Sequence, residues 1–168
     1  MIDWNTHLTE VMDRTEFMAL TTSGPEGNWV CPVQFSYDEH LNLYFKSMPH
    51  SRHMQDIRAN PDVAIAIFST NRFPGGDVAG IQLQGQAKIL SAQSEVEVAA
   101  KYHYGRSQPE IDYHTRVAER MGENAEWNFV KVVPTEVWCF DTRHFDEERQ
   151  RVSLEGLALK VRSVTKMA

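Results

Sequence analysis

The fold is decided by one stretch, Trp29-Val30-Cys31-Pro32-Val33-Gln34-Phe35-Ser36-Tyr37. All of its odd-numbered positions are aromatic or apolar, whereas Pro, Gln and Ser fill most of the even-numbered ones. A period of two is typical of a strand with one face in a core, and a run of this length favours a barrel or a sandwich. A dense turn signal at residues 24–28 precedes the stretch and follows a β-like segment at residues 17–23.

The segments that follow also have the pattern of strands. Leu41, Leu43 and Phe45 continue the apolar face beyond a turn, so an antiparallel hairpin is expected. The run Val63–Phe68 is apolar throughout and is predicted to be a strand buried on both faces. Two longer strands are predicted at residues 81–89 and 127–141. The second is interrupted by Pro134, where a bulge or a sheet edge is expected.

Helical signals fill the intervals between these strands. They predict helices at residues 5–14, at residues 52–59, from a capping box at Ser94 to Gly105, and from Pro109 to Gly122. No alternating βαβ pattern and no Gly-x-Gly-x-x-Gly motif occurs, which argues against a dinucleotide-binding Rossmann fold. We therefore predict a mainly β protein with helices, of the α+β class, built on a small six-stranded antiparallel barrel.

Composition limits the range of functions. The chain has 168 residues and a formal charge of −6, with 17 Lys and Arg against 23 Asp and Glu. A length of this order predicts one domain, here residues 1–143, and a C-terminal segment, residues 144–168, in which Val152–Val161 fits either a strand or a helix. An acidic chain without a basic block is a poor ligand for nucleic acid. No apolar run is long enough to span a bilayer and no secretory signal is seen, so we expect a cytoplasmic protein without a membrane partner.

The residues between the strand that ends near Ser47 and the next helix carry the clearest chemical signal. Lys46 and Ser47 end the strand, Ser51 is a candidate N-cap, and Arg52 and His53 follow in the first helical turn. Two potential cations at the positive end of a helix dipole are unfavourable unless an anion binds there. A phosphate would be attracted by the free N–H groups, the dipole and the guanidinium together. Taken alone, these residues also fit a solvated surface with no ligand.

Other candidate groups are weaker. His50 and His53 lack a third metal ligand, and the remaining histidines, His7, His40, His103, His114 and His144, are interpreted as surface or hydrogen-bonded residues. No metal site is therefore predicted. Cys31 is predicted to be a small buried apolar residue rather than a nucleophile. The glutamines at positions 82, 84 and 86 form a polar stripe, which fits a solvated exterior or a row of amides around a heteroaromatic ligand.

Four segments, taken in order, resemble the FMN-binding split-barrel family, which comprises pyridoxamine 5′-phosphate oxidase-like and general stress protein-like flavoproteins. These segments are Leu20-Thr21-Thr22 with the Gly-rich turn and Pro32-Val33-Gln34-Phe35-Ser36-Tyr37-Asp38; Leu43-Tyr44-Phe45 with Ser51-Arg52-His53 and Asn60-Pro61; Ile81-Gln82-Leu83-Gln84-Gly85-Gln86-Ala87; and Val133-Pro134-Thr135-Glu136-Val137 with Phe140. The resemblance runs from about Phe17 to Asp141 and makes the expected barrel a split β-barrel with flanking helices.

The resemblance implies a homodimer that holds two FMN molecules at its interface. It places Pro32, Val33, Gln34 and Phe35 against the isoalloxazine, Phe45, Lys46 and Ser47 near the ribityl chain and phosphate, and Ser51, Arg52 and His53 in a phosphate clamp. It also places Phe140, with Trp138 on the same strand face, near the flavin of the partner subunit. Gly80 stands where the family's oxidases carry a flavin-binding glutamine, which Gln82 would replace. Their C-terminal Arg-x-His and Arg-Leu-x-Pro motifs are absent, which argues against vitamin B6 oxidation.

Three functions remain open from the sequence. The first is an FMN-dependent oxidoreductase or flavin reductase that takes hydride from a nicotinamide or another small-molecule donor. The second is a non-catalytic flavin carrier or sensor, and the third is a haem-binding split barrel with His50 or His53 as a ligand. FAD or a deazaflavin could replace FMN in the first two. A dimer is also expected from surplus aromatic surface, contributed by Trp29, Val33, Phe35, Tyr37, Trp127, Phe129, Trp138 and Phe140.

Overall fold

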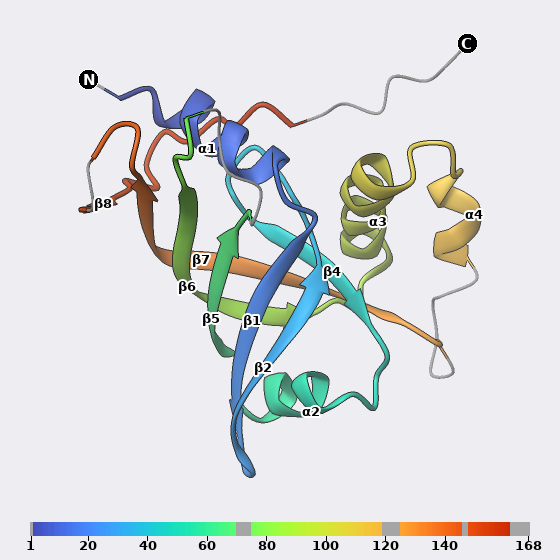
Figure 1. Ribbon diagram of the computed structural model, residues 1–168. Helices are drawn as coiled ribbons and strands as arrows, with labels where there is room; N and C mark the ends of the chain where they lie inside the picture. Colours follow the sequence, from blue (N-terminus) through green and yellow to red (C-terminus); the bar gives the residue numbers. More distant parts are fainter. Residues whose placement is uncertain (1, 70–74, 119–124, 146–147, 162–168) are drawn as a thin grey trace.

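The computed structural model describes residues 2–69, 75–118, 125–145 and 148–161, and it contains one curled antiparallel sheet with helices around it (Figure 1). The strands are β1 (Phe17–Gly24), β2 (Gly27–Gln34), β3 (Ser36–Tyr37), β4 (Leu43–Ser47), β5 (Asp62–Phe68), β6 (Ala79–Ile89), β7 (Asn128–Asp141) and β8 (Arg149–Arg151). The helices are α1 (Trp4–Asp13), α2 (Arg52–Ala59), α3 (Gln93–Ser107) and α4 (Tyr113–Ala118).

The α+β class is confirmed, but the prediction of six strands is wrong. The described residues form eight strands in the order β2-β1-β5-β6-β7-β4-β3, with β8 paired to β7. The stretch that decides the fold divides at Phe35, whose N–H donates to the carbonyl of Glu16 at 3.1 Å. On one side of Phe35 the chain pairs with β1, and on the other it pairs with β4. The two ends of the sheet thus meet in one stretch of chain, and the sheet curls into a half-barrel.

β5 is not buried on both faces as predicted. Val63, Ile65 and Ile67 point into the core, whereas Ala64 and Phe68 on the other face are exposed. The apolar run misleads because alanine is compatible with either environment, while the β-branched residues that fill the core all fall on one side of the strand. The outer face of the sheet is consequently bare in a single chain.

The irregularity predicted at Pro134 is confirmed as a bulge. Gln84 of β6 lies opposite Glu136 of β7, and Gly85 lies opposite Pro134, so Thr135 is the extra residue. A Cβ at Gly85 would lie 2.7 Å from the Val133 carbonyl oxygen, so the close approach of the two strands requires glycine here.

α1 and α2 close the two ends of the half-barrel, and α3 and α4 lie beside the sheet (Figure 1). α2 buries Met54 and Ile57 at one end, and α1 buries Leu8 and Met12 at the other. The predicted helix at residues 52–59 is confirmed, and that at 5–14 is shifted by one residue. The capping box at Ser94 is wrong, because α3 starts at Gln93 with Ala92 as N-cap, and α3 continues past Gly105. The predicted helix end at Gly122 lies outside the described residues.

The C-terminal segment packs against the barrel. Val152, Leu157 and Leu159 are buried in the same core as the strands of the sheet. After β8, residues 152–161 form neither of the two structures considered for them, a strand or a helix. The positions of the apolar side chains at 152, 157 and 159 are determined by contacts with the barrel and α1, and they do not follow the period of a helix or a strand. Among the described residues no helix combines the length and the apolar character needed to cross a membrane.

Candidate functional site

Three of the predicted phosphate-binding residues meet where β4 leads into α2. Ser47 ends the strand, Ser51 is the N-cap of the helix, and His53 lies in its first turn. The Nε2 atom of His53 is 2.6 Å from the Ser47 Oγ and 3.2 Å from the Ser51 Oγ, and the two hydroxyls are 3.2 Å apart. We refer to Ser47, Ser51 and His53 as the hydroxyl–imidazole triangle.

The start of α2 is left open to an anion. The side chain of Ser51 makes no capping hydrogen bond, and no acidic residue lies in the first turn. The first N–H groups of a helix have no intrahelical partners, and the dipole gives that end partial positive charge. The nearest acid on the helix, Asp56, is buried and accepts a hydrogen bond from the Thr22 hydroxyl at 2.8 Å, so its carboxylate is directed at β1.

Arg52 is held in place by the β1–β2 hairpin. Its guanidinium lies over the Trp29 ring, 4.6 Å from the centroid, and its Nη2 donates to the Glu26 carbonyl at 3.1 Å. The Glu26 carboxylate is 3.9 Å from Nη1. The Nε atom is buried and has no hydrogen-bond partner among the described residues. A buried N–H without an acceptor costs free energy, so this arrangement favours binding of an acceptor.

Burial lowers the pKa of His53, and the nearby Asp56 carboxylate opposes that shift more weakly. The imidazole is therefore neutral at neutral pH and can accept or donate at Nε2 within the hydroxyl–imidazole triangle. A dianionic phosphate placed here would meet hydroxyls, a neutral imidazole and one guanidinium.

Lys46 does not join this group. Along β4 successive side chains alternate between faces, so Phe45 and Ser47 point one way and Lys46 the other. The Lys46 Nζ donates to the Tyr104 hydroxyl at 3.4 Å and lies 5.7 Å from the Trp127 ring centroid. Phe45 is buried in the core, with its ring centroid 6.3 Å from that of His53. The structure thus brings Phe45 and Ser47 to the start of α2 and places Lys46 beside α3.

The predicted isoalloxazine segment is divided between two environments. Val33 and Phe35 point into the core, and the Phe35 ring is covered by the Arg106 guanidinium at 4.6 Å. Pro32 is exposed on the outer face, opposite Ala19 of β1, and Gln34 is half-buried on β2 opposite Phe17. Pro32 and the half-buried Gln34 thus lie on the outer face, where a ligand could reach them, while Val33 and Phe35 face the core.

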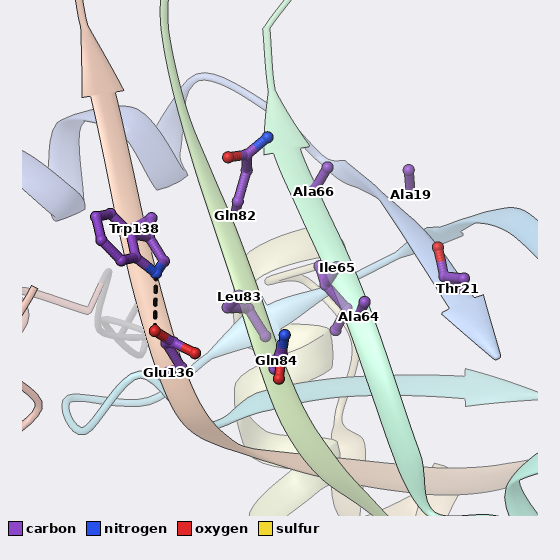
Figure 2. Close-up of a pocket in the computed structure, with 10 residues that line it drawn as sticks. All are labelled: Ala19, Thr21, Ala64, Ile65, Ala66, Gln82, Leu83, Gln84, Glu136 and Trp138. Atoms are coloured by element: carbon purple, nitrogen blue, oxygen red, sulfur yellow. Dashed lines mark hydrogen bonds between the residues drawn. The ribbon is translucent and has the colours of Figure 1, made fainter. Parts of the chain in front are cut away.

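The outer face of the sheet carries a shallow groove of about 380 Å³ (Figure 2). Its floor is made of the small side chains Ala19, Thr21, Ala64 and Ala66, which come from β1 and β5. Polar and aromatic side chains on β6 and β7 line the other side: Gln82, Gln84, Glu136 and Trp138. The indole N–H of Trp138 donates to the Glu136 carboxylate at 3.0 Å, as Figure 2 shows.

Gln82, Trp138 and Phe140 share this outer face. Gln82 lies directly opposite Trp138 on the neighbouring strand, and Gly80 lies opposite Phe140. A Cβ at Gly80 would be 2.5 Å from the Phe140 ring, so the ring occupies the space that a side chain at position 80 would need. The Arg149 Nε donates to the Gln82 amide oxygen at 2.9 Å.

The predicted residues therefore form two separate groups on one chain. Ser47 pairs with Asn128 at the beginning of β7, while Trp138 lies farther along the same strand. From Asn128 to Trp138 a strand advances about 30 Å. None of the residues of the hydroxyl–imidazole triangle lines the groove that contains Trp138.

Sequence reasoning missed Trp29 and Glu26 as supports of Arg52, and Arg149 as a partner of Gln82. The alternation predicts Trp29 on the apolar face or in a dimer interface, and the structure leaves it exposed near the tip of the β1–β2 hairpin. Arg149 lies in a charged segment without periodicity, so no local signal could have identified its role.

Residues 5–140 match the sequence profile of the pyridoxamine 5′-phosphate oxidase family. The match covers most of the chain, and the chain belongs to this family. The predicted resemblance is confirmed. No curated protein matches the sequence significantly.

Solved structures agree with this fold at low sequence identity. A conserved hypothetical protein from Mycobacterium tuberculosis has a TM-score of 0.69 at 15% identity, over 91% of this chain and 92% of that one. A heme binding protein from Mycobacterium smegmatis has a TM-score of 0.67 at 15% identity, over 92% of this chain and 60% of that one. A FAD-binding protein from Mesorhizobium loti has a TM-score of 0.60 at 18% identity, over 80% of this chain and 92% of that one.

Proposed function

We propose that this protein binds a phosphorylated flavin, FMN, with the phosphate at the start of α2. The observation that carries the proposal is the buried Nε of Arg52, which has no acceptor among the residues that the structure describes and lies beside an uncapped helix start. A phosphate supplies the acceptor for Arg52 and for the first-turn N–H groups. Ser51, Arg52 and His53 hold the phosphate, with Ser47 orienting His53 through their 2.6 Å contact.

The residues at the start of α2 fit the phosphate of the flavin. The isoalloxazine ring would be contacted by residues of a second copy of the chain. The groove over Ala64 and Ala66 offers a flat apolar floor, and Gln82 and Trp138 offer an amide and an indole beside it. We infer that this outer face meets the flavin held by a partner subunit, because the two groups of residues do not converge within one chain. Bound FMN supplies the hydride-transfer chemistry, and the protein binds and orients it and limits access of water.

A homodimer follows as part of the proposal. Large apolar residues surround the groove and are each at least 36% exposed: Phe17, Val30, Phe68 and Trp138. A two-fold copy would cover this face and complete the flavin site. The dimer does not rest on the aromatic surplus inferred from the sequence, because Phe35, Tyr37 and Phe129 are buried in their own chain.

The proposed activity is that of an FMN-dependent oxidoreductase that accepts hydride from a nicotinamide or another small-molecule donor. The alternative is a flavin carrier or sensor with the same phosphate site. Haem is the second candidate cofactor, favoured by the structural similarity to a heme binding protein. Flavin fits the site better, because the His53 Nε2 is already engaged by two hydroxyls. A cytoplasmic location remains a prediction.

The test starts from the visible spectrum of the purified full-length protein and the mass of its released chromophore. A yellow flavin spectrum that titrates to one FMN per chain supports the proposal. A Soret band on haem titration, with no saturable FMN binding, would overturn it. Anaerobic NADH or NADPH then separates the two flavin functions: rapid bleaching indicates an oxidoreductase, and an unchanged spectrum indicates a carrier or sensor.

A further inference from the structure

Three side chains of the kinds that ligate metals in proteins lie close together at the end of β7. His7 lies in α1, Asp141 is the last residue of β7, and His144 lies in the turn that follows. Their ligand atoms all lie within 4.8 Å of one another. The His7 Nε2 is 3.2 Å from the Asp141 Oδ2, and the two imidazole centroids are 5.1 Å apart.

Two of these groups are deeply buried. His7 is 7% exposed and Asp141 is 0% exposed, whereas His144 is exposed. The His7 Nε2 faces the carboxylate, yet it makes no well-formed hydrogen bond to any described residue. A buried polar nitrogen that lies near a carboxylate without forming a hydrogen bond to it requires an explanation, and a bound ion is one. The His7 Nε2 points at a carboxylate oxygen, and a second imidazole lies beside it. These three groups are ones that together could bind a cation.

We propose that His7, Asp141 and His144 bind a divalent first-row transition metal ion. Two imidazoles and one carboxylate suit Zn²⁺ and its neighbours better than Mg²⁺ or Ca²⁺, which prefer oxygen ligands. Zinc–ligand bonds of about 2.1 Å in a tetrahedron put ligand atoms about 3.4 Å apart. His7 and Asp141 already meet this spacing, and rotation of the exposed His144 side chain closes the third distance. Water completes the coordination.

The surrounding charges also fit a cation. The Asp141 carboxylate accepts from the Arg143 Nη2 at 2.6 Å, from the Arg143 Nε at 3.0 and 3.2 Å, and from the Arg143 backbone N–H at 2.9 Å. The Arg143 Nη1 donates to Glu10 at 2.9 Å. Two carboxylates and one guanidinium leave a net charge of about −1 around neutral imidazoles. Ligating carboxylates in metal sites are themselves hydrogen-bonded, so Arg143 orients Asp141 rather than replacing the ion.

The position of the ligands indicates a structural role. His7 packs against the rings of Trp4 and Phe145, at 5.9 and 5.7 Å between centroids, so one side of the site is shielded by aromatic groups. α1 also holds the C-terminal segment, because the Ala158 N–H donates to Asn5 at 2.8 Å and the Lys160 N–H donates to Thr9 at 3.1 Å. A metal ion that joins α1 to the end of β7 would stabilise this whole end of the barrel.

The test uses the full-length protein after treatment with a chelator, titrated with Zn²⁺ alone by calorimetry. We expect saturable binding of one ion per chain and a rise in melting temperature at saturating Zn²⁺. His144→Ala changes an exposed side chain and should fold, but it should weaken Zn²⁺ binding at least tenfold and abolish the rise. His50→Ala is the matched control, because it removes another exposed histidine and should leave both results unchanged.

The proposal would be overturned if Zn²⁺ binding does not saturate up to about 1 mM, because a dissociation constant above that value corresponds to very weak binding. Equal Zn²⁺ affinity in the wild-type protein and His144→Ala would overturn it as well, since the ion would then lie elsewhere. A fall in affinity in His50→Ala alone would place the metal at the start of α2 instead. Zn²⁺ affinity should be the same with and without saturating FMN, because the two sites are separate.

Discussion

The start of α2 and the outer face of the sheet are built in opposite ways. At the start of α2, polar groups from β4, α2 and the β1–β2 hairpin are held together by contacts within one chain. On the outer face, small and aromatic side chains lie side by side with little to cover them. The start of α2 is organised before a ligand binds, whereas the outer face leaves apolar side chains exposed to solvent. The contrast supports the proposed homodimer, in which one chain anchors the cofactor and a second copy covers it.

The largest expected effect comes from a charge on the bare face. Ala64→Arg should convert a dimer to a monomer in sedimentation experiments and weaken FMN binding by at least about a hundredfold, because a buried unpaired charge in an interface is costly. Ala59→Arg is the matched control, since Ala59 is exposed at the far end of α2 and should tolerate arginine. If Ala64→Arg remains a dimer and binds FMN normally, the outer face is not the dimer interface that completes the flavin site.

Next in size is the close contact between Gly80 and Phe140. Gly80→Ala places a Cβ 2.5 Å from the Phe140 ring and 2.9 Å from the Ile67 carbonyl, so we expect a loss of about 1–3 kcal/mol in the free energy of unfolding. Denaturant unfolding measures it. The double variant Gly80→Ala/Phe140→Leu should recover part of the loss. Unchanged stability in Gly80→Ala would mean that the ring does not occupy this space.

A smaller effect is expected from pH. Burial lowers the pKa values of His53 and His7 in the folded protein, so near pH 6 the unfolded chain binds more protons than the folded one. The free energy of unfolding should therefore fall as pH drops below about 6.5, by at most about 1.4 kcal/mol per pH unit for each proton. His53→Gln should reduce the slope and leave the part due to His7. A stability that rises below pH 6.5 would contradict the burial of these imidazoles.

The smallest effect is expected from the ring that supports Arg52. Trp29→Ala removes a cation–π contact of about 0.5–1 kcal/mol, which corresponds to a loss of about two- to fivefold in FMN affinity. Asn28→Ala, at the adjacent exposed position, is the control and should bind FMN normally. If Trp29→Ala binds FMN as tightly as the wild-type protein, preorganisation of Arg52 contributes nothing.

Sequence patterns were sufficient where one short segment determines the structure. The helix at residues 52–59, the bulge beside Pro134 and the shared face of Trp138 and Phe140 depend on local spacing, and the structure agrees with them. The Ser51-Arg52-His53 motif could be recognised for the same reason, because its members lie in one helical turn.

The rest depended on contacts that local patterns do not encode. Alternation continues through Phe35, so the change of neighbours there had no signal. Ala64 is apolar in sequence whether it faces a core or a groove. The alternation along β4 does direct Lys46 away from Ser47, but its contact with Tyr104 of α3 appears only in the folded chain. His7 and Asp141 lie at opposite ends of the sequence and are joined only when α1 packs at the end of β7.

The central claim is that the start of α2 binds the phosphate of FMN, and Arg52→Ala tests it most directly. Titration of the apoprotein with FMN and with riboflavin, which lacks the phosphate, should show FMN affinity reduced about ten- to hundredfold, since a charge-assisted hydrogen bond contributes about 1.5–3 kcal/mol. Riboflavin affinity should hardly change, and Arg58→Ala on the same helix should bind both ligands normally. Equal FMN affinity in the wild-type protein and Arg52→Ala, with both folded, would contradict the account.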